Sequence, residues 1–111
     1  MSKETAVKRN KQDVTLSSGR AIKLKEMSID DIDFCQDISQ IVYSDDGEVA
    51  GIKGMSKSRT AWIRRGILEG DFKNLELNGK GHLADSCIKE LSEDEKNELV
   101  GLIQRYQTLG E

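Results

Sequence analysis

The hydrophobic pattern changes its period along the chain, and this change limits the possible folds more than any other feature of the sequence. Apolar residues first alternate with polar ones in two short runs, at Val14, Leu16, Ile22 and Leu24. Such alternation is typical of strands with one buried face. After residue 28, several segments have apolar residues that recur every three or four positions, which is the spacing of amphipathic helices. The sequence therefore predicts an α+β fold, with a β-hairpin at about 13–26 packed against three to four helices.

A Ser-Gly pair marks the turn of this hairpin, and the length of the loop decides which strand residues face each other. A two-residue loop would set Val14 opposite Lys23. A three-residue loop over 18–20 would set Val14 opposite Leu24 and would keep all four apolar side chains on one face of the hairpin. We therefore expect the three-residue loop.

Helix signals follow in four segments, at about 28–43, 56–70, 83–91 and 92–109. Ser28 is the expected N-cap of the first helix, and either Ser56 or Ser58 is the expected start of the second. The last helix has the clearest start, because Ser92 and Glu95 have the spacing of a capping box. These signals complete the predicted helical part of the fold.

The length of 111 residues is that of one domain, which we expect to span residues 13–111. Residues 1–12 carry four cations and only two interior apolar residues, so we expect a flexible N-terminal tail. The net charge of −3 creates no overall field that would attract nucleic acid or an acidic membrane.

Cys35 and Cys87 are the only cysteines, and they form no CxxC motif. Two free thiols are typical of a reducing compartment. No apolar run approaches the ~20 residues that a membrane-spanning helix needs. We therefore expect a cytoplasmic protein without membrane contact.

Patterns for catalytic, cofactor or metal chemistry are incomplete. Residues 51–59, GIKGMSKSR, resemble a phosphate-binding loop, but Ser56 stands where that loop requires a glycine before the lysine. His82 has no second histidine or cysteine at zinc spacing. His82 could form a nucleophile pair with Cys35 or Cys87, yet Cys87 lies on the apolar side of a predicted helix, which favours a buried thiol. We predict no catalytic residue, no cofactor and no metal site.

Residues 47–66, GEVAGIKGMSKSRTAWIRRG, resemble the DNA-binding segment of small excisionase-like helix-turn-helix proteins. The resemblance implies a first helix over about 48–52 and a recognition helix with a cluster of basic residues, Lys57, Arg59, Arg64 and Arg65. Interior glycines weaken the first of these helices, each by roughly 1 kcal/mol relative to alanine. The basic cluster could equally be a solvated helix face. A DNA-binding regulator is therefore the alternative function.

Two other segments resemble a different family. Residues 14–31, VTLSSGRAIKLKEMSIDD, and residues 89–107, KELSEDEKNELVGLIQRYQ, are similar to bacteriophage tail assembly chaperones and related small tail morphogenesis proteins. The resemblance implies a non-enzymatic protein that binds the tape measure protein and recruits tail tube subunits. A homo-oligomer is a separate expectation for its partners. A minor virion structural subunit is a further alternative.

The candidate contact surface for such a partner is the apolar face of the last predicted helix, formed by Leu99, Leu102, Ile103 and Tyr106. This face must be buried, either against the protein's own core or against a helix of the tape measure protein. Trp62 is a second candidate, although the low aromatic content of the chain favours a core position for it.

Overall fold

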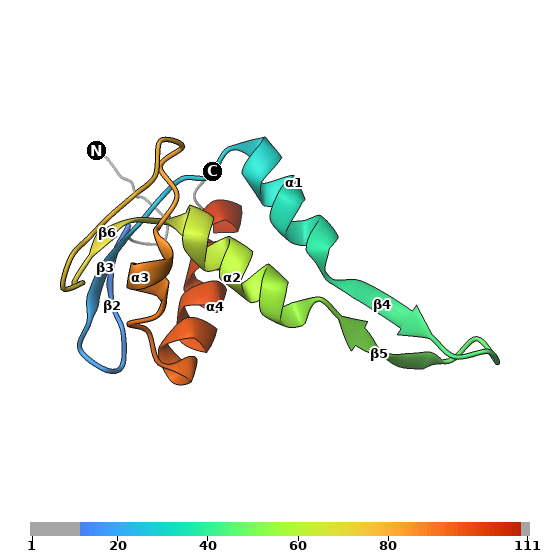
Figure 1. The fold of residues 1–111 in the computed structure, drawn as a ribbon. Helices are drawn as coiled ribbons and strands as arrows, with labels where there is room; N and C mark the ends of the chain where they lie inside the picture. Colours follow the sequence, from blue (N-terminus) through green and yellow to red (C-terminus); the bar gives the residue numbers. More distant parts are fainter. Residues whose placement is uncertain (1–11, 110–111) are drawn as a thin grey trace, which may run out of the picture.

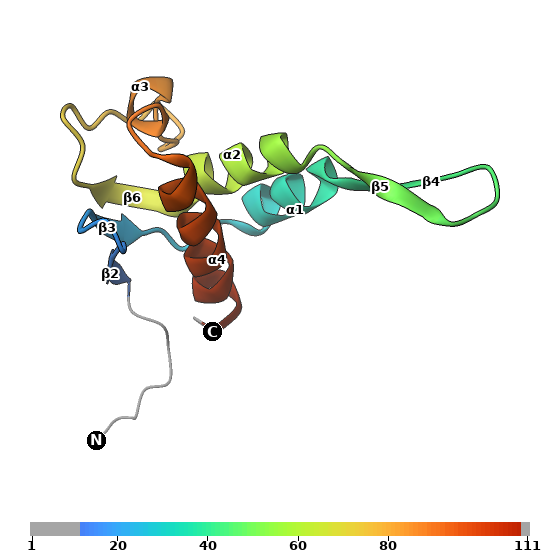
Figure 2. The same cartoon turned by 90° about the horizontal axis from the view of Figure 1, so that it is seen from below.

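The computed structural model describes residues 12–109 and confirms the α+β class (Figure 1). The elements follow in the order β2 (Asp13–Thr15), β3 (Ala21–Leu24), α1 (Ile29–Ile38), β4 (Gln40–Tyr43), β5 (Val49–Lys53), α2 (Met55–Gly66), β6 (Ile67–Gly70), α3 (Asp85–Ile88) and α4 (Glu93–Leu109). They form a body and an arm. The body contains the four helices and an antiparallel sheet with the strand order β2-β3-β6. The arm is the β4–β5 hairpin, residues 40–53, which projects from the body between α1 and α2 (Figures 1 and 2).

The predicted tail lies outside the described residues except for Gln12, which is not free. Its backbone carbonyl accepts a hydrogen bond from the amide of Leu24 at 2.7 Å, and its side chain donates to the Leu24 carbonyl at 3.0 Å. Gln12 therefore extends the ladder between β2 and β3 by one residue.

The predicted apolar face of the N-terminal hairpin is confirmed, because Leu16, Ile22 and Leu24 are all buried. The predicted register is wrong. Val14 pairs with Ile22 instead of Leu24, since the loop spans residues 17–19 and not 18–20. The loop still has three residues, so the pairing moves by two positions and every apolar side chain stays on the same face.

The same five-residue turn occurs three times in the described chain, at residues 16–20, 44–48 and 78–82. In each turn the first amide donates to the carbonyl of the fifth residue, and the fourth amide donates to the carbonyl of the first, at 2.7–2.9 Å. The fourth residue is a glycine with a φ of +77° to +99°. A left-handed residue at this position is typical of three-residue hairpin loops, which explains why the loop begins at Ser17.

Helix α1 begins as predicted but ends earlier. The Ser28 hydroxyl accepts a hydrogen bond from the amide of Asp31 at 3.1 Å, which confirms the N-cap. The helix ends at Ile38, and residues 40–43, predicted to be helical, form strand β4. The second turn of the recurring type, at 44–48, folds the chain back onto β4 and creates a hairpin where the sequence predicted the end of a helix.

Helix α2 differs from its prediction at both ends. Its N-cap is Gly54, with a φ of +82°, and neither predicted serine caps it. The helix ends at Gly66, and residues 67–70 form strand β6, which pairs with β3. Ile63 and Ile67 have helical spacing, but Ile67 is fully buried as the partner of Leu24 in the sheet. Sheet pairing thus overrides the helical pattern here.

The last two helices are close to the predicted ones. Helix α3 is a single short turn within the predicted range, and α4 starts one residue after Ser92. The capping box is confirmed: the amide of Glu95 donates to the Ser92 hydroxyl at 3.1 Å, and the amide of Ser92 donates to the Glu95 carboxylate at 2.9 Å.

One core joins the sheet to the helices, and it contains buried side chains from β3, α2, β6, α3 and α4. Helices α2 and α4 approach each other closely in this core. A Cβ atom at Gly66 would lie 2.4 Å from Cγ2 of Ile103, so the last residue of α2 has no room for a side chain. Figure 2 shows α4 crossing α2 at this end of the body.

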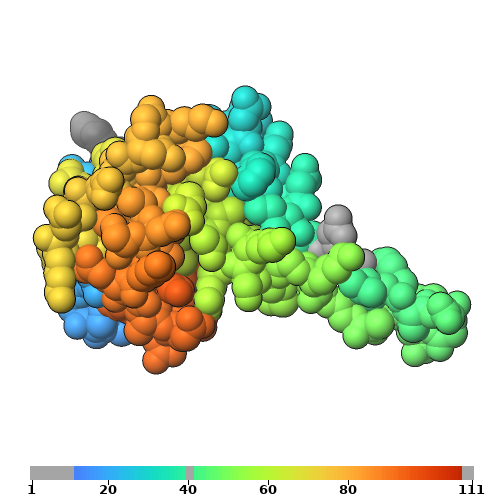
Figure 3. Space-filling model, in the orientation of Figure 1, coloured from blue at the N-terminus to red at the C-terminus, as the bar shows by residue number. Residues whose placement is uncertain are grey.

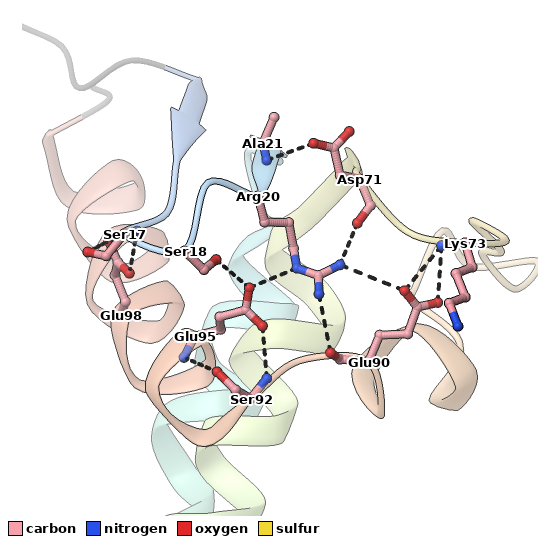
Figure 4. Close-up of polar contacts among 10 residues, drawn as sticks. All are labelled: Ser17, Ser18, Arg20, Ala21, Asp71, Lys73, Glu90, Ser92, Glu95 and Glu98. Carbon is pink, nitrogen blue, oxygen red and sulfur yellow. Dashed lines mark hydrogen bonds and ion pairs between the residues drawn. The ribbon is translucent and has the colours of Figure 1, made fainter.

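A polar network fixes the turn of the N-terminal hairpin to the start of α4 (Figure 4). Arg20 is its centre. The guanidinium donates to the Glu95 carboxylate at 2.9 Å and to the Glu90 carbonyl at 3.2 Å, and the Ser18 hydroxyl also donates to Glu95, at 2.6 Å. These donors, with Arg20 and Ser18 as the main causes, lower the pKa of Glu95 to about 2. Glu95 is therefore both a helix cap and an ionised link between hairpin and helix.

Candidate protein-binding site

The described side chains of the arm, at residues 42–53, contribute no buried side chain to the core of the body. In the space-filling view it extends away from the body as a narrow projection (Figure 3). Its two strands pair antiparallel, with Val42 opposite Gly51 and Tyr43 opposite Val49. One extra residue, Ala50, lies in β5 between these two pairs and forms a β-bulge.

The tip of the arm is a well-defined turn. The Ser44 hydroxyl donates to the Asp46 carboxylate, and the same carboxylate accepts the amide of Glu48 at 3.2 Å. These bonds lower the pKa of Asp46, with the Ser44 hydroxyl as the larger cause. The Asp46 carboxylate therefore stays ionised at the tip, where the chain reverses direction.

One face of the arm is apolar and open to solvent. Directly opposite residues of an antiparallel pair lie on the same face, and positions two apart along a strand do so too. Tyr43 and Val49 face each other, and Ile52 lies opposite position 41, two residues before Tyr43. All three therefore share one face, on which they are 61%, 64% and 53% exposed. Exposed apolar residues that are contiguous, and not scattered, are typical of interaction sites.

Charge is distributed unevenly along the arm. Asp45, Asp46 and Glu48 are exposed at its tip, whereas Lys53 is exposed at its base. Lys57 is exposed on the adjoining first turn of α2. The arm therefore has an acidic end and a basic end, joined by an apolar face.

Close backbone packing holds the base of the arm. A Cβ atom at Gly54 would lie 2.5 Å from the carbonyl oxygen of Ile38 and 3.4 Å from the Cα atom of Ser39. The hydroxyl of Ser58 donates to the carbonyl of Cys35 at 3.2 Å, which connects α2 to α1 one turn further in. The two ends of the arm thus leave the body side by side.

The α4 face predicted to be a partner surface is mostly core. Leu99 and Ile103 are 0% exposed, and Leu102 and Tyr106 are partly buried against the same core. Of the two alternatives for this face, the protein's own core is therefore correct for Leu99 and Ile103. A partner could reach these two residues only if α4 left the body.

Trp62 is also a core residue, at 5% exposure. It lines two surface hollows that share Ser39, Ser58 and Gln104, one between α2 and α4 and one that also includes residues of α1. The core position expected from the sequence is therefore confirmed, although one edge of the indole borders the surface close to the base of the arm.

The basic residues of the helix-turn-helix prediction are largely engaged within the protein. Arg59 contacts Glu93 at 2.9 Å, Arg64 contacts Asp85 at 2.6 Å, and Arg65 contacts Asp31 at 3.4 Å. These pairs connect α2 to α4, α3 and α1, so three of the four cations serve helix packing. Lys57 is exposed.

The geometry of a helix-turn-helix is not formed. Its first helix was expected at 48–52, but residues 49–53 are strand β5. The glycines that weakened the helical prediction belong to a hairpin and its base: Gly47 to the turn, Gly51 to the strand and Gly54 to the N-cap of α2.

His82 and Cys35 lie in the neighbourhood of one acid but form no reactive pair. The His82 imidazole is 3.6 Å from the Asp31 carboxylate, and burial, followed by the charge of Arg65, lowers the pKa of His82. Burial raises the pKa of Cys35 to about 11, and the side chain is fully enclosed, so the thiol is protonated near neutral pH. Arg65 stacks over the ring of Phe34, with 4.2 Å from the guanidinium carbon to the ring centre. This cluster joins α1 to α2 and to the loop before α3.

Within residues 12–109, no cluster of three or more His, Cys, Asp or Glu side chains has the arrangement of a metal site. In the same range, no helix combines the length and the apolar character that crossing a membrane requires.

The arm residues were not predicted as a site, although the sequence contains a usable signal. SDDGE has the same glycine position as LSSGR, which was correctly identified as a hairpin turn, and it is flanked by IVY and VAGI. Strand-forming residues on both sides of such a turn indicate a hairpin. The helical spacing of residues 34–42 concealed this signal.

Comparison of the chain with protein-family models, with curated proteins and with solved structures gives no match in any of the three.

Proposed function

We propose that this protein is a non-enzymatic assembly factor that binds another polypeptide through its arm, in the manner expected of a bacteriophage tail assembly chaperone. The observation that carries the proposal is the exposed apolar face of the arm, formed by Tyr43, Val49 and Ile52. Such a face on a projecting hairpin costs solubility unless it has a binding role.

The shape of the arm supports a macromolecular partner over a small molecule. A small-molecule site usually encloses most of its ligand in a concave pocket. The arm is a narrow projection and not a concave pocket (Figure 3), so it can bury its apolar face only against a surface of comparable size. Aromatic residues such as Tyr43 are frequent anchors of protein interfaces.

The family resemblance supplies the class of partner. The proposed partners are the tape measure and tail tube proteins of a phage, and the proposed location is the cytoplasm of the host cell. Two buried, free cysteines are consistent with a reducing compartment.

The proposal is tested by affinity capture of candidate tape measure and tail tube proteins on the immobilised full-length chain. The triple variant Tyr43→Ser/Val49→Thr/Ile52→Thr should weaken capture by more than about tenfold, because it removes the apolar anchors of the interface. The control is Leu75→Ser, which removes an exposed apolar side chain from a loop of the body. It should leave capture unchanged.

Equal capture by the triple variant and the wild type would remove the arm from the binding site. Failure to capture any tail protein, together with specific retention of a DNA fragment, would instead favour the regulator.

A further inference from the structure

We propose that strand β5 pairs with β5 of a second copy of this chain, edge to edge and antiparallel, so that two arms form one four-stranded sheet. This inference rests on the proposed role of the arm as a contact surface and adds a specific partner for its edge. The first observation is that the arm is a sheet of only two strands, β4 and β5, whose outer edges have no neighbouring strand in the described part of the chain. Two-stranded hairpins are marginally stable in water, and a third strand or a packing surface is normally needed.

The sequence of β5 and the residue before it is complementary to itself when read in opposite directions. In the antiparallel register that joins Glu48 to Lys53 of the second copy, Val49 lies opposite Ile52, and Ala50 lies opposite Gly51. Each of these pairs occurs twice because the arrangement has two-fold symmetry. Acid meets base and apolar meets apolar along the whole strand.

This register requires Val49 and Ile52 to point to the same face, although an odd spacing would normally place them on opposite faces. The bulge at Ala50 removes this difficulty. Because Ala50 is the extra residue in the ladder, Val49 and Ile52 share one face of the arm. The bulge is therefore what makes the strand self-complementary.

The centre of the strand has two small residues, Ala50 and Gly51, which leave room for the backbone of the second copy. Ala50 is exposed, and a Cβ atom at Gly51 would have no other atom within 4 Å. The φ of Gly51 is also not in the left-handed region, so neither local conformation nor intramolecular packing requires a glycine there. A glycine inside a strand often marks close approach of another backbone.

Charge favours the antiparallel arrangement over the parallel one. Antiparallel arms place the acidic tip of one copy, with Asp45, Asp46 and Glu48, beside the basic base of the other, with Lys53 and Lys57. Parallel arms would bring two acidic tips together. Edge pairing also leaves the face with Tyr43, Val49 and Ile52 open, so the dimer would offer the proposed partner twice the apolar area.

The test measures the monomer–dimer equilibrium of the full-length protein by sedimentation velocity over a range of concentrations. Wild type should form a dimer that weakens with added salt. Lys53→Glu and Glu48→Lys should each raise the dissociation constant about tenfold, because each creates two like-charge pairs. The double variant Glu48→Lys/Lys53→Glu should return to within about threefold of wild type, since it exchanges the charges and restores both pairs.

Lys80→Glu controls for net charge, because Lys80 is an exposed lysine in a loop of the body and should not affect the dimer. Amide hydrogen exchange provides a second measurement: protection of β5 should rise with protein concentration, whereas protection of α4 should not.

A protein that stays monomeric up to about 0.5 mM overturns the inference, as does a dimer that ignores both single charge reversals or is not restored by the double variant. The capture experiment separates this result from the proposed function. A monomer that still captures a tail protein through Tyr43, Val49 and Ile52 overturns only the dimer, and a dimer that captures nothing overturns only the proposed function.

Discussion

At the scale of single residues, the glycines show how far local chemistry determines this structure. Gly54 and Gly51 are three positions apart, and the sequence suggested for both only roles that the structure does not show, in a helix-turn-helix or a phosphate-binding loop. Gly54 has a left-handed φ of +82°, and a Cβ atom there would lie 2.5 Å from the Ile38 carbonyl oxygen, whereas a Cβ atom at Gly51 would have open space around it. A glycine-to-alanine substitution therefore adds a Cβ atom to a crowded position at Gly54 and to an open position at Gly51.

Gly54→Ala should destabilise the protein by about 1–3 kcal/mol, because alanine is strained at this φ and its Cβ would collide with the main chain of α1. Gly51→Ala should change the free energy of unfolding by less than about 0.5 kcal/mol. Urea unfolding followed by circular dichroism measures both. Equal effects of the two substitutions would show that the close contact at the base of the arm is not present in solution.

Glu95 gives the stability of the protein a defined pH dependence. Its pKa is about 2 in the folded state, below the ordinary value of 4.5 that it regains on unfolding. Its stabilising contribution is therefore fully present above about pH 5 and is lost as the pH falls from 4.5 towards 2. The contribution should be about 1.5–3 kcal/mol, the range for hydrogen bonds to a charged group.

Glu95→Gln isolates this effect, because glutamine can maintain a capping box but carries no charge. Urea unfolding of both proteins between pH 6 and pH 2.5 should show a stability difference that shrinks as the solution is acidified. A difference that does not change with pH would mean that the ion pair with Arg20 contributes nothing.

At the scale of elements, the predictions succeeded where local signals and tertiary packing agree. Ser28 and the Ser92–Glu95 box fixed the starts of α1 and α4, and the apolar face of the first hairpin was identified from alternation alone. They failed where one segment carries two signals. Residues 40–43 continue the helical spacing of α1, and residues 67–70 continue that of α2, yet both segments pair as strands. Pairing with a strand distant in sequence is not visible in the local period.

The candidate site was harder to predict than the fold, for a related reason. The face of Leu99 and Ile103 has a strong amphipathic pattern, but such a pattern shows only that the face is buried, not what buries it. Gly66 decides the matter, since its lack of a side chain lets α2 approach Ile103. The arm has a weak pattern because none of its described side chains, at residues 42–53, is buried in the body, so periodicity could not identify it.

The arm should be removable without unfolding the body. A Cβ atom at Gly54 would lie 3.4 Å from the Cα atom of Ser39, so these two residues are close enough for two glycines to replace residues 40–53 and still join α1 to α2. We expect this variant to keep its helical circular dichroism signal and a melting temperature within about 5 °C of wild type, because the core lies in the body. Thermal unfolding measures this, and loss of cooperative unfolding would show that the arm is part of the folding unit.

At the scale of the whole molecule, the arm makes the protein unusually extended for its length. The radius of gyration is 15.8 Å, and the longest principal extent is 55 Å against 36 and 29 Å for the others. A compact domain of this size would have a radius of gyration of about 13 Å.

Small-angle X-ray scattering of wild type and of the arm-deleted variant should therefore differ by about 2 Å in radius of gyration, at concentrations low enough to keep both monomeric. Comparing the two proteins cancels the contribution of the residues outside the described range. Equal radii would show that the arm folds back onto the body in solution.

The neighbouring exits of the two arm strands have one more consequence. Any insert whose own ends lie close together can take the place of this hairpin without altering the distance between α1 and α2. The body could therefore be used as a scaffold that displays an epitope loop or a foreign hairpin in place of the arm, projecting away from the rest of the surface.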